Sequence, residues 1–404
     1  MMKYLYIVCA LIFVATESIS QDRLFNVDIY GMVAVDVAHN TRGSRMARND
    51  HIYLYPLPSG KDNDHDINDR GTFDIDAAHS RFGLNVLGPE VNGISTLAVL
   101  EADFLGDARF ADSNFRLRHA YLQLGYNNIT FIVGQTWHPF FVPENFPQTG
   151  NTCVGVPMYP LSRNPQLRFS YRFNEDVEII AALIEQNNFR SAGFVKGSEE
   201  AQVPETVIQL KLGGEGNAFA TFSAGYKRLA IPQDISQTED QPVIGSTHYQ
   251  ASFRYQLPRL TFRAGGIYGG NLTEHVIPGG VGEVIESSGT NSPEYEALKV
   301  ATLWSDLEVM NETWRPGFFT GYLNRLGSSD EVDVIDDLSM DPGLSSLFVV
   351  SPRIRYVLAD HINITLEYYF SRAGWGEEFD YYGVGDDVSY YNNHRSLLSF
   401  KYLF

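Results

Sequence analysis

Nine arginines offer the clearest chemistry in this sequence, because each falls within a strand-like run and, where polar and apolar residues alternate clearly, on the polar side. Guanidinium groups bind carboxylate and phosphate through paired hydrogen bonds, and a ring of such groups around an aqueous passage favours anions. A competing hypothesis is that they pair with Glu101, Asp103 and Glu367 and brace a wall. The nine are Arg81, Arg116, Arg118, Arg168, Arg172, Arg254, Arg263, Arg353 and Arg355.

A long segment without strand or helix periodicity lies beside these arginines. Residues 138–164 are rich in proline and aromatics, and an irregular insert of this length is usually functional. We expect it to form a constriction, with a latch between subunits or an external cap as the alternative. Its residues of interest are His138, Phe141, Glu144 and Phe146, and Arg116, Arg118, Arg168 and Arg172 flank it in sequence.

Motifs of common enzymes and metal sites are missing from the sequence. It contains no HExxH, GxSxG, CxxC or P-loop pattern, so we predict no catalytic residue, no metal ligand and no cofactor. The two cysteines are Cys9 and Cys153, which argues against a disulfide framework. We interpret Cys153 as a small packed residue.

The elements that must position the arginines are runs of about ten to fifteen residues with period-two alternation. In residues 166–174, Leu167 and Phe169 share one side while Arg168 and Arg172 share the other, as expected for a wall between lipid and water. About sixteen such runs come in pairs, with short joints within pairs and long polar stretches between them. A soluble sandwich would give the same period, but it has no reason for this asymmetry.

The pattern therefore predicts an all-β fold, a 16-stranded antiparallel transmembrane β-barrel. We expect short periplasmic turns, long extracellular loops and an inward-folded third loop, which is the segment 138–164.

The two ends of the sequence predict an exported outer-membrane protein. Residues 1–20 have the pattern of a secretory signal peptide, with Lys3, a short apolar run and a small-x-small site; a retained anchor is the alternative. Residues 21–404 then form a single barrel. Leu398, Phe400 and Tyr402 share one side with the terminal Phe404, which is typical of the signal recognised by barrel-assembly machinery. The predicted surroundings are lipid and lipopolysaccharide of a Gram-negative-type bacterium.

The charge balance excludes one class of partner. A formal charge of −19 makes nucleic acid a poor partner, since its phosphates need lysine and arginine. The acids cluster in predicted loops, where they would attract cations and oppose an anion preference set by the strands.

Four stretches resemble the DcaP-like trimeric porins. They are residues 80–84 (SRFGL), 100–106 (LEADFLG), 115–121 (FRLRHAY) and 133–137 (VGQTW). The resemblance implies a 16-stranded homotrimer with a constricting third loop that passes small anionic solutes such as dicarboxylates. Members often carry an N-terminal periplasmic coiled coil. Here the first strand begins close to residue 21, so barrel walls alone would hold a trimer.

These observations predict an outer-membrane porin for passive diffusion of small hydrophilic, anionic solutes. One alternative is a plugged barrel that serves in docking or adhesion. Another is an outer-membrane barrel hydrolase with serine and histidine at its rim.

Overall fold

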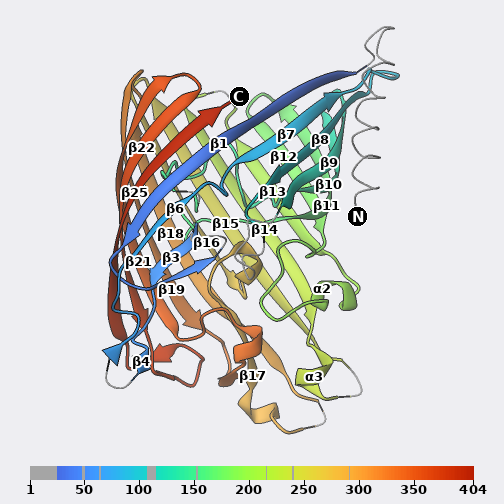
Figure 1. Ribbon diagram of the computed structural model, residues 1–404. Helices are drawn as coiled ribbons and strands as arrows, with labels where there is room; N and C mark the ends of the chain where they lie inside the picture. Colours follow the sequence, from blue (N-terminus) through green and yellow to red (C-terminus); the bar gives the residue numbers. More distant parts are fainter. Residues whose placement is uncertain are drawn as a thin grey trace, which may run out of the picture.

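The chain folds into a closed antiparallel β-barrel of sixteen wall strands, as the alternation predicts (Figure 1). The computed structural model describes residues 25–47, 51–62, 65–106, 115–151, 153–214, 216–238, 241–290 and 292–404. The predicted signal peptide, residues 1–20, lies outside the described residues.

One wall strand is divided into two pieces, β6 and β7. The wall consists of β1 (Asn26–Asn40), β6 (Thr72–Asp76) with β7 (Arg81–Leu87), β8 (Ser95–Asp103), β9 (Arg116–Tyr126), β10 (Ile129–Trp137), β11 (Arg163–Asn174), β12 (Val177–Ile184), β13 (Glu205–Leu212), β14 (Ala218–Ala230), β15 (Val243–Leu257), β16 (Leu260–Gly270), β18 (Tyr295–Val309), β19 (Trp314–Gly327), β21 (Leu344–Ala359), β22 (Ile362–Trp375) and β25 (Ser389–Leu403).

Short elements occupy the connections between wall strands. They are β2 (Ser44–Ala47), β3 (Ile52–Pro56), β4 (Lys61–Asp62), β5 (His65–Asp66), α2 (Gly197–Glu200), α3 (Gln233–Ser236), η2 (Thr273–His275), β17 (Gly280–Val284), η3 (Ile285–Ser287), β20 (Val332–Val334), η4 (Asp336–Leu338), β23 (Glu378–Phe379) and β24 (Gly385–Asp386).

The barrel closes where the first wall strand meets the last. β1 pairs antiparallel with β25, with Met32 opposite Leu403 and Asn40 opposite Arg395. Beyond this register, Gly31 and Phe404 exchange backbone hydrogen bonds of 2.8 and 3.1 Å. Closure removes the unpaired edges that an open sheet would expose.

The two ends of the barrel differ in the length of their connections. At one end β9 and β10 are joined by Asn127 and Asn128 alone, and Asn127 has the positive φ of 49° that the tight turn requires. At the other end lie long connections such as 41–71, 138–162, 185–204 and 271–294. Figure 1 shows β4, β17 and α3 at this end. In chain order, the connection 138–162 follows 41–71 and the connection between β8 and β9, so it is the third at this end. Its bounds agree within two residues with those of the predicted third loop, 138–164.

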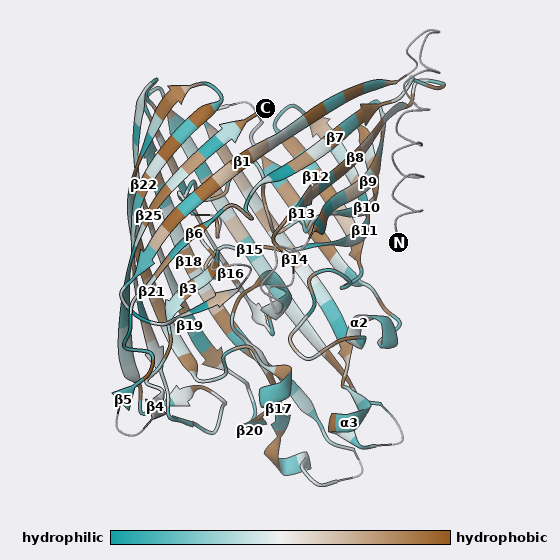
Figure 2. Cartoon of the chain, in the orientation of Figure 1, coloured by the Kyte–Doolittle hydropathy of each residue, from teal (hydrophilic) through white to brown (hydrophobic). Residues whose placement is uncertain are grey.

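The outer face of the barrel is apolar. Phe169 is 44 % exposed, whereas its neighbour Ser170 is 6 % exposed and faces inward. Figure 2 shows this alternation along the wall strands. Exposed aromatic and aliphatic side chains on one face suit hydrocarbon, as in transmembrane barrels. Among the described residues, no helix is both long and apolar enough to cross a bilayer.

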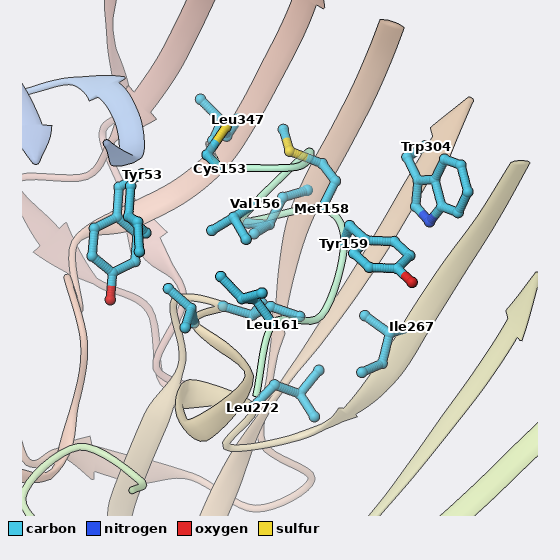
Figure 3. Close-up of a cluster of buried hydrophobic side chains, with 14 of the residues drawn as sticks. Tyr53, Cys153, Val156, Met158, Tyr159, Leu161, Ile267, Leu272, Trp304 and Leu347 are labelled. Carbon is cyan, nitrogen blue, oxygen red and sulfur yellow. The ribbon is translucent and has the colours of Figure 1, made fainter. Parts of the chain in front are cut away.

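The barrel interior contains a buried apolar cluster to which four loops contribute side chains, among them Phe189 from the connection 185–204. Figure 3 shows Met158 and Tyr159 of the third loop close to Trp304 of the wall, with Leu272 of the sixth loop and Tyr53 of the first loop in the same cluster. The sequence predicted an inward path for the third loop alone. The apolar piece in the first loop is too short for its pattern to indicate whether it is buried.

Candidate functional site

The third loop, residues 138–162, lies inside the barrel and is tied to the wall at its tip. The Glu367 carboxylate on β22 accepts hydrogen bonds from the backbone N–H of Gly150 (2.5 Å) and of Asn151 (3.3 Å). The hydroxyl of Thr302 on β18 donates to the carbonyl of Met158 at 2.7 Å. These bonds satisfy backbone groups that would otherwise be buried without partners.

Cations on the wall hold a second part of the loop. Lys211 Nζ on β13 lies 2.7 Å from Glu144 Oε1, and Arg254 Nη1 on β15 donates to the Glu144 carbonyl at 2.7 Å. Burial raises the pKa of the Glu144 carboxyl, but the Lys211 ammonium outweighs burial and holds that pKa below its usual range.

A cavity of about 430 Å³ separates the loop from the wall on the remaining side. The loop contributes an aromatic surface, in which Phe141 stacks on Trp137 with ring centroids 3.7 Å apart and Phe146 follows at 5.7 Å. The facing wall is formed by β1, β7, β8, β9, β21, β22 and β25. Its charged lining residues are Arg81, Glu101, Arg116, Arg118, Arg355 and Lys401, and Arg163 joins them from the start of β11.

The cavity lining is strongly cationic. Among the described residues, six arginine and lysine side chains line it against a single carboxylate, that of Glu101. Three of these cations, Arg116, Arg118 and Arg355, are also paired with Asp103, Glu101 or Glu308. A cationic lining in a narrow aqueous space raises the local concentration of anions.

Two of these arginines also brace the wall. Arg116 Nη2 and Arg118 Nη1 lie 2.5 and 2.9 Å from Asp103 Oδ2, and Arg118 Nε also donates to Glu101. Asp103 is 1 % exposed and lies behind the lining. Arg116 and Arg118 therefore line the cavity and also form ion pairs within the wall.

Glu367 accepts hydrogen bonds from the third loop, and in the described part of the chain it does not form the ion pair with wall arginines that was considered above. Its place is taken by Asp306 on β18. Arg353 Nη1 lies 2.7 Å from Asp306 Oδ1, and Arg263 Nη1 lies 3.3 Å from Asp306 Oδ2. Arg355 bonds Glu308 at 3.2 Å and still reaches the cavity.

Five of the nine arginines do not line the cavity, and two of these, Arg263 and Arg353, pair with Asp306 as described above. Arg168 donates to the carbonyl of Trp137 and at 3.0 Å to Gln166 Oε1. Arg172 lies near the short-turn end, with its side chain 65 % exposed and 4.0 Å from Glu178. Arg254 donates to the Glu144 carbonyl of the third loop, as described above. Proximity in sequence to the third loop was therefore a poor guide for Arg168 and Arg172.

Sequence reasoning missed Arg163 and Lys401. Arg163 is buried at the start of β11, with its guanidinium 4.4 Å from the Trp137 ring centroid. The predicted loop, residues 138–164, includes Arg163 and so leaves it out of the strand arginines. Lys401 lies on the polar side of β25 and donates to the Gly150 carbonyl at 3.2 Å, so the alternation of the last strand could have identified it.

The expected loop residues divide between two environments. Phe141 and Phe146 line the cavity, and Glu144 contacts Lys211. His138 is fully buried and its Nε2 lies 3.0 Å from Glu205 Oε1 on β13, so it does not line the cavity.

Comparison with known proteins agrees with this architecture. The DcaP outer membrane protein family matches residues 12–198. Among solved structures, the outer membrane channel DcaP of Acinetobacter baumannii has a TM-score of 0.69 at 17% identity, covering 95% of this chain and 99% of that one. No curated protein sequence matches significantly.

Two further structures share the fold at lower similarity. An anion-selective porin from Comamonas acidovorans gives a TM-score of 0.57 at 10% identity, with coverage of 94% and 100%. OmpT, an outer membrane protein of Vibrio cholerae, in its trimer form, gives 0.52 at 10% identity, with coverage of 94% and 99%. The resemblance noted in the sequence is thus confirmed, and with it the fold and an outer-membrane location.

Proposed function

We propose that this outer-membrane barrel, whose residues 12–198 match the DcaP outer membrane protein family, is a porin through which small hydrophilic anions diffuse. The observation that carries the proposal is the cavity beside the third loop, where six cationic side chains face one carboxylate. The third loop narrows the lumen, and the cationic wall beside it favours anions.

The cavity also indicates the class of solute. Guanidinium groups on adjacent strands suit carboxylate or phosphate, which accept two parallel hydrogen bonds. The opposite surface presents Phe141 and Phe146, which tolerate a short hydrocarbon portion. A volume of about 430 Å³ suits a small solute. The preferred anion therefore combines one or two acidic groups with a compact carbon skeleton.

We further propose a homotrimer held by barrel walls and surrounded by lipid and lipopolysaccharide. The outward aromatic and aliphatic side chains supply the apolar surface that subunits and lipid would share. The trimer form of the Vibrio cholerae protein gives this assembly a precedent on the same fold. Chemical cross-linking in native membranes should give a trimer band.

The decisive experiment is single-channel recording of the purified barrel in a planar bilayer under a salt gradient. The reversal potential should show anion preference, and Arg81→Gln and Lys401→Gln should each roughly halve the anion-to-cation permeability ratio. These two positions are better first choices than Arg116 and Arg118, because removing either of those would take one of its two charged partners from the buried Asp103.

The matched control is Arg372→Gln. Arg372 is an exposed arginine on β22, with its guanidinium 4.5 Å from the Tyr390 ring centroid, and it does not line the cavity. It should leave the reversal potential unchanged. Cation preference of the wild type would assign control to the acidic loops, and absence of conductance would favour a plugged docking barrel. Hydrolysis of phospholipid or peptide by the purified barrel would contradict a purely diffusive role.

A further inference from the structure

A second group of chemically active side chains lies away from the cavity, between the third loop, the sixth loop and the wall. It consists of His138 at the start of the third loop, Glu205 on β13, His248 on β15 and His275 in η2. One nitrogen or oxygen from each lies within 4.8 Å of the others. All four residues are 0–1 % exposed.

The carboxylate of Glu205 organises the group. Its Oε1 lies 3.0 Å from His138 Nε2 and 2.7 Å from His248 Nε2. The His275 ring completes the arrangement, with its centroid 4.6 Å from that of His138 and 5.8 Å from that of His248. Two loops and two strands therefore direct imidazole and carboxylate groups to one point.

The group contains more buried polar atoms than its hydrogen bonds satisfy. Within the described chain, Glu205 Oε2, His248 Nδ1 and both ring nitrogens of His275 have no hydrogen-bond partner. The carboxylate oxygen nearest to His275 Nε2, Glu274 Oε1, is 3.5 Å away and is already bonded by Lys227 Nζ. Buried polar groups are normally paired, so unpaired atoms on three adjacent residues call for a ligand.

His138 has a different role from the other two histidines. The Phe140 backbone N–H donates to His138 Nδ1 at 3.1 Å, so in the neutral ring Nδ1 keeps its lone pair and Nε2 carries the proton. His138 Nε2 then donates to Glu205 Oε1 and fixes the carboxylate. This makes His138 a positioning residue of the kind that supports metal-bound carboxylates.

We propose that Glu205, His248 and His275 bind a divalent transition-metal ion, for which Zn²⁺ has the best-matched ligand preference. Imidazole nitrogen and carboxylate oxygen are its usual ligands besides thiolate. The surroundings carry two carboxylates, Glu205 and Glu274, against the single ammonium of Lys227, so with neutral imidazoles a negative charge is left for a cation to balance.

The proposed ion would join both inward loops to the wall. Zinc ligands in a tetrahedron lie about 3.4 Å apart, so the side chains need to move inward only slightly from their present spacing. Binding would stabilise the folded barrel and hold the third loop in place. The sequence predicted no metal ligand because the three residues lie in separate segments without a recognisable spacing. The proposal is independent of whether the barrel conducts.

Metal content of the full-length purified barrel tests the site. The protein is stripped with a chelator, loaded with ZnCl₂, desalted and analysed by mass spectrometry for metal. We expect about one zinc per chain. His275→Ala and His248→Ala should lower retention at least tenfold, and Co²⁺ loading of the wild type should give visible absorption that these variants lack.

His394→Ala provides the matched control. His394 lies on β25, where its Nδ1 is 2.6 Å from the Tyr368 hydroxyl, and it is exposed outside the cluster. Its removal should leave zinc retention unchanged. His138→Gln should keep the stoichiometry but weaken affinity roughly tenfold, since it acts through Glu205.

Two results would overturn the assignment. If the folded wild type, checked by its heat-modifiable mobility in gels, retains no zinc, the cluster is only an internal hydrogen-bond network. If His275→Ala and wild type retain equal zinc, the ion lies elsewhere. The wild-type measurement decides the first point even if a variant fails to fold.

Discussion

At the scale of single residues, Cys153 is a side chain of the third loop that is fully withdrawn from water. It is 0 % exposed, and its thiol donates to Asn151 Oδ1 at 2.6 Å. Burial raises the pKa of the Cys153 thiol to about 12. The reactive form of cysteine is the thiolate, so this residue should be inert while the loop is folded.

We therefore expect no labelling of Cys153 by maleimide at pH 8 in the folded barrel and complete labelling in denaturant. A Ser329→Cys variant, in an exposed external loop, should label in both states and serves as the control. Rapid labelling of the folded wild type would mean that the third loop leaves the lumen.

Glu144 gives a prediction for pH. Because Lys211 holds the folded-state pKa of Glu144 below the unfolded value of about 4.3, the pair stabilises the folded barrel above that pH and loses this contribution as pH falls through the folded-state pKa. Glu144→Gln should lower the unfolding temperature at pH 7 by roughly 1–3 °C, because the pair is partly exposed. Thermal unfolding followed by circular dichroism should show this difference vanish below the folded-state pKa. A difference that persisted there would point to packing and not charge.

At the scale of elements, the attachment of the third loop to β22 depends on one carboxylate. Besides the two backbone bonds, Asn151 Nδ2 donates to Glu367 Oε1. Glu367→Ala would remove these acceptors together and leave Gly150 and Asn151 with buried unpaired donors. Each lost bond to a charged group is worth about 1.5–3 kcal/mol.

We expect Glu367→Ala to release the loop tip, which should increase single-channel conductance and current noise and lower stability by several kcal/mol. Glu312→Ala, on an exposed short turn, controls for the loss of a negative charge. Unchanged conductance in a stable Glu367→Ala barrel would show that the other contacts of the loop hold its tip in place without Glu367.

The sequence predicted the wall strands well and the loops poorly, for a physical reason. Alternation such as that of Leu167, Phe169 and Tyr171 follows from the two solvents on either side of a wall and is local. Inward folding of residues 52–55 depends on contacts with β22, such as Trp375 Nε1 to the Pro56 carbonyl at 2.9 Å. Those partners are far apart in sequence, so no local pattern reports them.

At the scale of the whole molecule, closure depends on the terminal residues of the last strand. Phe404 exchanges backbone hydrogen bonds with Gly31, and its exposed ring continues the outer apolar face. Phe404→Ala should lower the amount of folded barrel recovered from the outer membrane several-fold, because it removes the proposed assembly signal. It should leave the reversal potential of assembled channels unchanged.

Phe222→Ala, on the outer face of β14 and away from the last strand, controls for loss of an exposed aromatic ring. Heat-modifiable folded protein in membrane fractions is the measurement. Equal recovery of both variants would remove any special role of the terminal residue.

The candidate cavity could be predicted only in part because it is assembled from wall strands near both ends of the chain. Arg81, Arg116 and Arg118 were found because they lie on polar sides of strands near the start of the chain. Their meeting with Arg355 and Lys401 requires the contact between β1 and β25. The separation of Arg172 from the cavity depends on height along the barrel axis, which alternation does not encode.

The pairing of β1 with β25 also determines when the protein can finish folding. Contacts between distant parts of a chain form slowly, because a large loop must close before they give any stabilisation. A chain held up before the seam closes leaves two strand edges and the apolar loop residues uncovered, and such species are prone to aggregation and open to proteases. The yield of newly made protein therefore depends on whether the seam closes faster than the open chain is degraded.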